Sequence, residues 1–143
     1  MVDKPLELNV LGPVSVDRNG AISRVGSTQE RMLLTALALS GPESVISGRL
    51  IDLIWGDDPP PSASGALKAL VHRIRRRYGR HVIETAPAGY QLGENVETDY
   101  AQVLKAMQAC RDALGIDDPA AALASAREAH TRFRGDFSQA LDA

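Results

Sequence analysis

A window of basic side chains stands out in an otherwise acidic sequence. Residues 59–83 contain six lysines and arginines and no acidic residue, whereas the 143-residue chain as a whole has a net charge of -2. A one-sided window of this kind usually faces a polyanion, but a solvated helix face would also explain it. The charge alone therefore leaves both interpretations open. The six basic residues are Lys68, Arg73, Arg75, Arg76, Arg77 and Arg80.

The apolar spacing within this window predicts an amphipathic helix over Ser62–Tyr78, closed by Gly79. At 100° per residue, one stripe of side chains is apolar and is expected to be buried. The opposite side is basic and begins with small residues, which let a helix approach a surface closely. The expected buried stripe is Leu67, Leu70, Val71, Ile74 and Tyr78, and the expected outer side is Gly65, Lys68, Ala69, His72, Arg73 and Arg76.

Short strands are expected at the start of the chain. Apolar and polar residues alternate at Leu6–Val10 and again at Val14–Val16, which is the period of a half-buried strand. Asn19-Gly20 is a typical hairpin turn. A small antiparallel sheet therefore accounts for roughly the first 25 residues.

Two helices are expected between this sheet and the basic helix. Ser27 and Glu30 have the spacing of a capping box, which predicts a helix that ends at Gly41. Val45-Ile46 is expected to form one short strand, and Ser47 is expected to cap a second helix. That helix must stop before three consecutive prolines, which a helix interior does not tolerate.

A second hairpin is expected after the basic helix, with its turn at Ala86–Gly89. The order sheet, helix, helix, basic helix, hairpin predicts an α+β winged helix-turn-helix with an N-terminal antiparallel sheet and a C-terminal hairpin. In such a domain the second helix of the pair lies in the major groove, where Arg and Lys supply donors to phosphates and base edges. The sequence therefore predicts double-stranded DNA as the partner.

The C-terminal part is rich in alanine and predicts an all-α helical hairpin. Asp99 and Asp118 are expected to cap its two helices, and Pro119 suits the first helical position. Two helices cannot bury both of their faces alone, so we expect a truncated chain or a partner that supplies the cover. The expected buried faces are Val103, Met107, Cys110 and Leu114 in the first helix and Leu123, Ala126, His130 and Phe133 in the second, which is expected to end at Gly135.

Enzyme signatures are missing: the sequence has no Lys-containing phosphate loop, no Gly-x-Ser-x-Gly elbow and no His-Glu-x-x-His. The single cysteine, Cys110, rules out an internal disulfide and is interpreted as a core residue. Asp57-Asp58 is interpreted as a solvated linker rather than a metal-binding pair. We therefore expect no enzyme activity, cofactor or metal. The lack of a secretory signal or membrane-spanning segment predicts a cytoplasmic, nucleoid-associated protein.

Several segments resemble the Streptomyces antibiotic regulatory proteins. Three of them are Leu50-Ile-Asp-Leu-Ile-Trp-Gly-Asp-Asp-Pro-Pro, Leu67-x-x-x-Val71-x-Arg73-Ile74-Arg75-Arg76 and Thr85-x-Pro87-x-Gly89-Tyr90-x-Leu92. The opening Leu11-Gly-Pro-Val-Ser-Val and the tail Ala126-Arg-Glu-Ala…Phe133-Arg-Gly-Asp-Phe137 are also similar to that family. The resemblance implies an OmpR-type winged-helix domain over residues 1–95. It also implies the start of a bacterial transcriptional activation domain, a tetratricopeptide-like helical unit, over residues 96–143.

This resemblance also implies partners. The family binds direct repeats near promoters and helps to recruit RNA polymerase holoenzyme, so a transcriptional activator is expected. The helical tail is a candidate for pairing two copies of the chain. The hairpin turn at Ala86–Gly89 departs from the family because it carries no arginine, so wing contacts are expected to come from backbone amides.

Candidate DNA-binding residues follow by matching position. Lys68, His72, Arg73 and Arg76 are expected to face DNA, while Arg75 and Arg77 lie toward the flanks and meet phosphates or acidic protein neighbours. Three further candidates fit a purely structural role as well as a DNA contact: the first by packing and the other two by helix capping. These are Trp55, which matches a phosphate-contacting position, and Ser62 and Ser64 near the start of the basic helix, where the helix dipole favours a phosphate. Arg80 and His81 are further candidates for phosphate contact.

Two other functions remain open at this stage. The basic helix of a protein-interaction module would dock on an acidic partner instead of DNA. A fragment of an enzyme would have its catalytic part beyond residue 143, and no residue of the sequence supports this. Binding to duplex DNA that weakens with salt, with a slope matching several displaced counterions, would favour DNA over an acidic protein.

Overall fold

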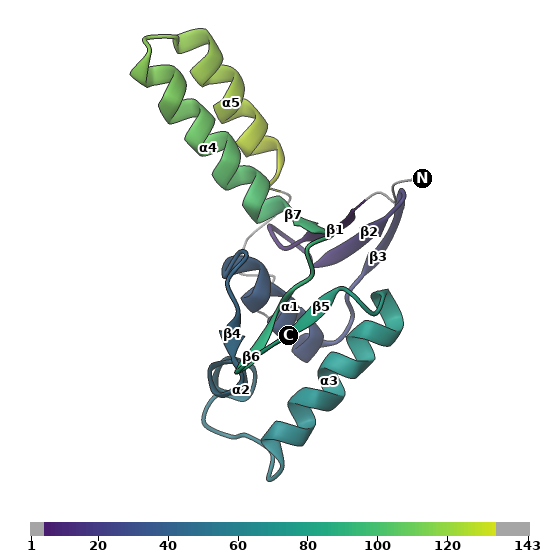
Figure 1. Cartoon of the computed structure of the whole chain (residues 1–143). Helices are drawn as coiled ribbons and strands as arrows, with labels where there is room; N and C mark the ends of the chain where they lie inside the picture. The colour runs from purple at the N-terminus through teal and green to yellow at the C-terminus, as the bar shows by residue number, and fades with distance from the viewer. Residues whose placement is uncertain (1–4, 134–143) are drawn as a thin grey trace.

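Two small β-sheets and three helices share one aliphatic core, and a pair of further helices projects from one end of it (Figure 1). The computed structural model describes residues 5–133. Among these residues, no helix is long and apolar enough to cross a membrane. In chain order the elements are β1 (Leu6–Asn9), β2 (Ser15–Arg18), β3 (Ala21–Arg24), α1 (Thr28–Leu39), β4 (Val45–Ile46), α2 (Ser47–Trp55), α3 (Ala63–Tyr78), β5 (Ile83–Ala86), β6 (Gly89–Leu92), β7 (Val96–Thr98), α4 (Asp99–Gly115) and α5 (Pro119–Thr131).

The first sheet has the strand order β3-β2-β1-β7. Strands β1, β2 and β3 are antiparallel, and Asn19 and Gly20 both have positive φ (54° and 90°) in the turn between β2 and β3. This is the backbone that a tight hairpin requires, so the predicted N-terminal sheet and its turn are confirmed. Strand β7 was not predicted from the sequence: it returns after the second hairpin and pairs parallel with β1, with Val96 opposite Leu6.

The second sheet has the order β4-β6-β5 and contains the predicted C-terminal hairpin. Strands β5 and β6 pair antiparallel, with Ile83 opposite Leu92 at one end and Ala86 opposite Gly89 at the turn. The two-residue strand β4 adds to β6, so the short strand predicted at Val45-Ile46 is confirmed. The β5–β6 hairpin, the wing of this fold, is joined to the start of α2, because the amide of Ser47 donates to the carbonyl of Ala88 at 3.0 Å.

The Ser27 half of the predicted capping box of α1 is confirmed, whereas the predicted cap of α2 is wrong. The Ser27 hydroxyl accepts a hydrogen bond from the Glu30 amide at 3.4 Å, as expected of an N-cap. Ser47 is instead the first residue of α2, and Ile46 occupies the N-cap position without a side-chain bond. The extended strand β4 runs directly into this helix, which leaves no separate capping residue between them.

The start of α4 also differs from the sequence prediction. Thr98, not Asp99, is the N-cap, and its hydroxyl accepts from the Ala101 amide at 3.0 Å. The buried carboxylate of Asp99 turns to the end of β1, where it accepts from the amides of Val10 (2.9 Å) and Leu11 (3.0 Å). Because a charged acceptor binding two amides is stronger than a neutral pair, this contact ties α4 firmly to the first sheet.

We expect the substitution Asp99→Asn to lower the free energy of unfolding by about 1–3 kcal/mol, because one of the two buried amides would lose its acceptor. Equilibrium unfolding in urea measures this change. The matched control is Asp52→Asn on the exposed side of α2, which should change stability by less than about 0.5 kcal/mol. Equal effects of the two substitutions would show that the Asp99 contact contributes nothing specific.

The second helix of the projecting pair is capped as predicted, but the predicted buried face of α4 is wrong in part and that of α5 is wrong at all four positions. The Asp118 carboxylate accepts from the Ala121 amide at 3.1 Å, with Pro119 in the first position. Small residues form the seam between α4 and α5, because alanines let two helix backbones approach closely. Buried on these helices are Val103, Ala106, Ala113, Ala122 and Ala129, with Cys110 half-buried, whereas Met107, Leu114, Leu123, Ala126, His130 and Phe133 are exposed.

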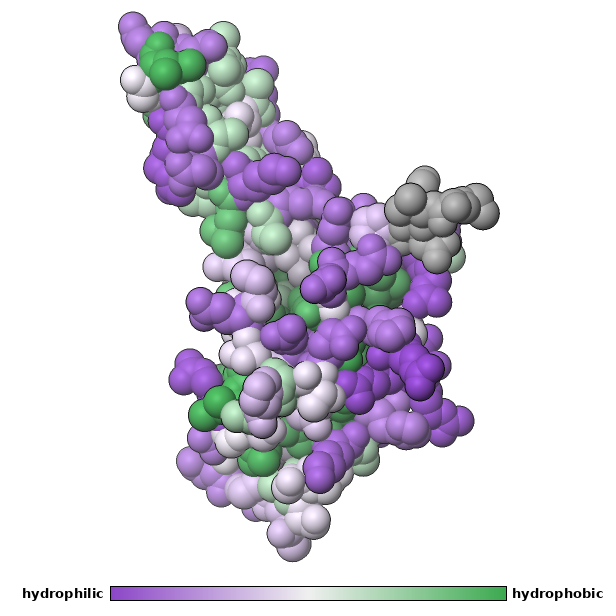
Figure 2. Space-filling view, in the orientation of Figure 1, coloured by the Kyte–Doolittle hydropathy of each residue, from purple (hydrophilic) through white to green (hydrophobic). Residues whose placement is uncertain are grey.

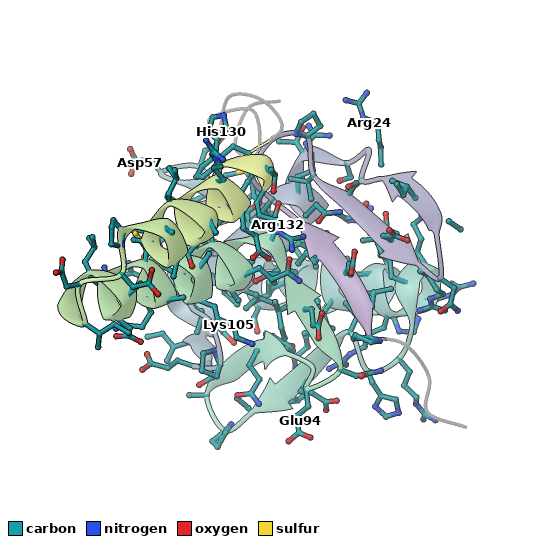
Figure 3. All side chains as sticks on the ribbon, turned by 90° about the horizontal axis from the view of Figure 1, so that it is seen from above. Arg24, Asp57, Glu94, Lys105, His130 and Arg132 are labelled. Atoms are coloured by element: carbon teal, nitrogen blue, oxygen red, sulfur yellow. The ribbon has the colours of Figure 1, made fainter. Side chains whose placement is uncertain are left out.

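The exposed apolar residues lie mainly on the outside and at the tip of the pair. Leu114 is 60% and Ile116 is 77% exposed, and Figure 2 shows a hydrophobic patch at this tip. His130 lies on the outer side of α5, away from α4 (Figure 3), so the packing role predicted for it is wrong. Helix α5 ends at Thr131, and the expected end at Gly135 lies outside the described residues, as does Phe137.

Candidate nucleic-acid interface

Helix α3 has one buried and one exposed side, as the sequence predicts. It lies at the end of the molecule remote from the α4–α5 pair (Figure 1). The predicted apolar stripe is confirmed in full, since all five of its side chains are at most 6% exposed. The outer side is open to solvent from the first turn to the last, and its exposed residues are Ser64, Gly65, Lys68, Ala69, His72, Arg73, Arg76 and Arg77.

The positive charge of this side is largely unneutralised. Within residues 5–133, the amino and guanidinium groups of Lys68, Arg73, Arg76 and Arg80 make no ion pair within 4.0 Å. Three consecutive arginines also crowd the last turn of α3, where the carbonyl ends of the helix dipole favour positive charge. A rigid helix that displays free cations on one side is suited to a polyanionic surface.

Arg75 differs from its neighbours because its donors are engaged within the molecule. It is half-buried, its Nε donates to the carbonyl oxygen of Ile83 at 2.9 Å, and its Nη2 donates to Thr85 Oγ1 at 3.0 Å. Both acceptors belong to β5. Arg75 therefore fixes the β5–β6 hairpin against α3, a positioning role that the spacing of α3 does not reveal.

We expect Arg75→Lys to lower the free energy of unfolding by about 1–2 kcal/mol, because a lysine keeps the charge but cannot make the forked pair of bonds. Urea unfolding and hydrogen exchange of the β5 amides measure the loss. The control is Arg73→Lys, at an exposed position without an ion pair, where the change should stay below about 0.5 kcal/mol. An unaltered stability in Arg75→Lys would contradict this positioning role.

Among the described residues, Arg77 is the one arginine of α3 that makes an ion pair within 4.0 Å. Its Nη1 lies 3.8 Å from Oε2 of Glu30, a buried residue in the first turn of α1. A small cavity of about 310 Å³ opens there, lined by Glu30, Arg73, Arg76 and Arg77. The capping-box spacing of Glu30 gives no indication of its place beside the arginines. No local signal indicates it, because 47 positions separate Glu30 from Arg77.

The remaining candidates lie around the two ends of α3. Trp55 is half-buried and packs on the main core, which favours the packing interpretation for most of its ring. Ser62 occupies the N-cap position, but its hydroxyl makes no capping hydrogen bond. Ser62 and Ser64 are both exposed residues at the start of the helix. Arg80 is exposed just after the other end.

The wing is short and uncharged at its tip, where Pro87 and Ala88 are exposed. His81 and Glu84 lie at its base, with His81 Nδ1 3.5 Å from Glu84 Oε1. A second arginine also supports the geometry here: the Arg18 guanidinium donates to the carbonyl of Tyr78, the last residue of α3. This contact joins the end of α3 to the first sheet, and no sequence pattern predicts it.

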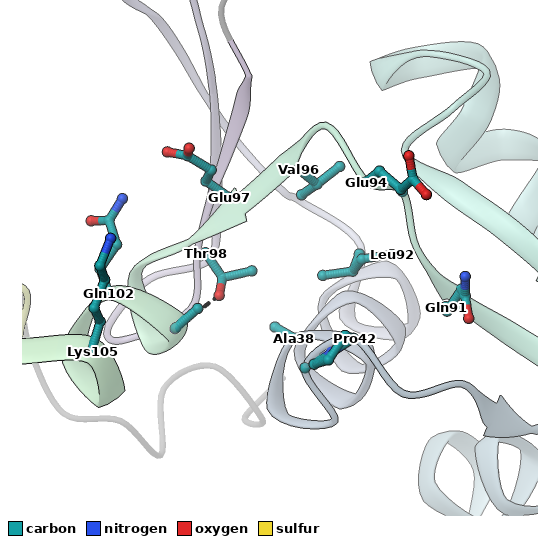
Figure 4. A pocket seen from close by; sticks show the side chains of 13 residues that line it. Ala38, Pro42, Gln91, Leu92, Glu94, Val96, Glu97, Thr98, Gln102 and Lys105 are labelled. Carbon is teal, nitrogen blue, oxygen red and sulfur yellow. Dashed lines mark hydrogen bonds between the residues drawn. The ribbon is translucent and has the colours of Figure 1, made fainter. Parts of the chain in front are cut away.

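A larger cavity of about 480 Å³ lies elsewhere, between the end of α1, the β6–β7 connection and the first turns of α4 (Figure 4). Its floor includes Leu92 and Val96, and Gln102 and Lys105 lie at its edge on α4. It contains no residue of α3. This cavity therefore belongs to the joint between the core and the helical pair, not to the basic surface.

The other candidates for chemistry are separated from one another. Asp57 and Asp58 are exposed in the connection between α2 and α3, and Cys110 lies half-buried in α4. In the described part of the chain, no group of three or more His, Cys, Asp or Glu side chains is placed to hold a metal ion.

Comparison with known proteins gives consistent relatives. The chain is 37% identical over 87 residues to the regulatory protein AfsR of Streptomyces griseus. The matched region covers 61% of this chain and 9% of AfsR. The chain is 34% identical over 71 residues to the transcriptional regulator RedD of Streptomyces coelicolor, covering 50% of the chain and 20% of RedD. The chain therefore spans about a tenth to a fifth of the length of these relatives. No family model matches it.

The fold has a solved counterpart. The structure of Mycobacterium tuberculosis EmbR in complex with a low-affinity phosphopeptide matches with a TM-score of 0.82 at 24% identity, covering 93% of this chain and 37% of that one. This likeness confirms the predicted α+β class, a winged helix followed by a helical part. The named relatives confirm the resemblance that the sequence motifs indicated.

Proposed function

We propose that this chain, a transcription regulator of the Streptomyces antibiotic regulatory protein type, binds double-stranded DNA with α3 in the major groove. The observation that carries the proposal is the outer side of α3, where Lys68, Arg73 and Arg76 are exposed and make no ion pair with the described carboxylates. The buried stripe on its other side holds the helix rigidly on the core. A preformed cationic helix of this kind meets the shape and charge of the major groove.

Roles within the surface follow from position. Lys68, His72, Arg73 and Arg76 occupy the middle of the exposed side, so they are the residues proposed to reach base edges. The residues proposed to contact phosphates lie at the ends of α3 and beside it. They are Trp55, Ser62, Ser64, Arg77 and Arg80, while Arg75 contributes mainly by fixing the wing.

The assignment of different functions to the two parts of the chain is also a proposal. Residues 1–95 form the DNA-binding domain, and residues 96–143 form the start of a transcriptional activation domain that helps to recruit RNA polymerase. Tandem modules would then bind direct repeats, one helical turn apart, near a promoter. The exposed apolar residues of α4 and α5 are available for contact between copies of the chain. DNA as the partner places the protein at the nucleoid.

The test is binding to the DNA upstream of the protein's own gene at several salt concentrations. On a duplex without the cognate site the four unpaired cations have only phosphates to contact, which predicts that log K falls with log salt with a slope of about -3 to -4. A footprint of two protected patches in the same orientation, about one helical turn apart, is expected. A slope near zero with duplex, together with tight binding to poly-glutamate, would contradict the proposal and favour an acidic protein partner.

A further inference from the structure

We propose that Glu30 restrains Arg77 and thereby limits the electrostatic, sequence-independent part of DNA binding. The inference rests on the proposed function and adds a residue outside the recognition helix to it. In the free protein Arg77 is held by Glu30, and duplex phosphates must compete with this carboxylate for the guanidinium. Glu30 is thus a positioning residue that weakens attraction to any duplex.

Glu30 is placed where an acidic side chain is unexpected. Its side chain is only 5% exposed, yet it lines the same cavity as Arg73, Arg76 and Arg77 on the side of the molecule proposed to face DNA. Burying a carboxylate is costly unless a partner offsets the lost hydration. The first turn of α1 supplies part of that compensation, because the positive end of the helix dipole favours an acid there.

The pair that Glu30 makes is suited to exchange. The distance of 3.8 Å between Arg77 Nη1 and Glu30 Oε2 is longer than a direct hydrogen bond, and the Arg77 side chain is 60% exposed. A partly solvated ion pair of this kind is weak enough for a phosphate to replace. The carboxylate also lowers the positive potential of the cavity that it shares with Arg73 and Arg76.

Limiting this attraction has a consequence for target search. Phosphate contacts supply nearly all of the binding to non-cognate DNA, whereas base contacts distinguish one site from another. A regulator that binds every duplex tightly would be distributed over competing sites. An acid fixed inside the basic surface reduces that background without removing a cation from α3.

The experiment measures binding of the chain to a scrambled 20-base-pair duplex at several salt concentrations. For Glu30→Gln we expect affinity about three- to tenfold higher than wild type, because Arg77 becomes available to a phosphate. The salt slope should steepen by about 0.9, the value for one further phosphate contact. The control is Glu97→Gln, which makes the same charge change at an exposed position of β7 and should leave the slope unchanged.

The variant Arg77→Gln distinguishes restraint of Arg77 by Glu30 from a general effect of the Glu30 charge. It also tests the inference if Glu30→Gln is unstable. Arg77→Gln alone should change the slope by less than about 0.3, because in the wild type a phosphate reaches Arg77 only by displacing Glu30, which then attracts a cation from solution. Arg77→Gln should also reverse the gain in the Glu30→Gln background. A loss of about 0.9 from Arg77→Gln alone, or equal slopes for Glu30→Gln and Glu97→Gln, would overturn the inference. If no variant, wild type included, binds duplex, the proposed function fails as well.

Discussion

Reversing two charges at the centre of α3, in the variant Arg73→Glu/Arg76→Glu, is expected to weaken binding to the promoter duplex at least about a hundredfold. Both side chains are exposed on the outer side of the helix. Loss of each arginine contact to a base costs about 1–3 kcal/mol, and the new carboxylates would also repel phosphates. Fluorescence anisotropy with cognate and scrambled duplexes at constant salt measures the loss. The single variants Arg73→Ala and Arg76→Ala should each show the smaller cost, largest on the cognate duplex if the contact is to a base.

The control for this prediction is Arg111→Glu/Arg127→Glu, which makes the same change of net charge on α4 and α5. Both control residues are exposed, and the helical pair lies at the other end of the molecule from α3 (Figure 1). The control should lose only a few-fold in affinity, since exposed charges beyond one Debye length are largely screened. Equal losses in the two variants would contradict docking through α3 and indicate a general effect of net charge.

Periodicity was a reliable guide wherever a helix packs on a large core. The five apolar residues of α3 recur at helical spacing, and the core covers all of them. The opposite, cationic side of the same helix then follows without further information. Most of the proposed DNA surface was therefore predictable from one segment of the sequence, because the exposed side of a helix is known once its buried side is known.

The same approach failed in part for α4 and α5, where no large core decides which side is buried. Met107 and Leu114 have helical spacing with Val103, but the seam runs through Ala106 and Ala113 instead. Over most of their length these two helices pack on each other, and they gain most from close backbone approach, which small side chains allow. A prediction from hydrophobicity places the larger apolar residues at the contact between the helices, and for this reason it chose wrong residues on each helix.

Three polar contacts that position the site were beyond any local pattern. Asp99 binds amides near residue 10, Arg75 binds strand β5, and Glu30 of α1 pairs with Arg77 of α3. Each joins segments that the fold brings together, and each residue also has an ordinary local interpretation, as a cap or as one basic residue among several. Polar residues that serve tertiary contacts carry no period that would distinguish them.

The second large effect is expected at the wing: Gly89→Ala should lower the free energy of unfolding by about 3 kcal/mol. A Cβ on Gly89 would lie 1.8 Å from the carbonyl oxygen of Val45 in the neighbouring strand β4. Because the obstacle is backbone, the strands must separate to admit a methyl group, and overpacking of this kind is strongly destabilising. Urea unfolding should show a midpoint lower by about 1–3 M, given slopes typical of small domains.

The control for the wing is Gly48→Ala, in the first turn of α2, where a Cβ meets nothing within 4 Å. Alanine is the better helix former, so this variant should be unchanged or more stable by up to about 1 kcal/mol. If Gly89→Ala were as stable as wild type, β4 would not be held against β6 as closely as this register requires. The Ser47–Ala88 hydrogen bond would then no longer be expected to fix the wing to the start of α2, and a rigid wing beside the recognition helix would have to depend on Arg75 alone.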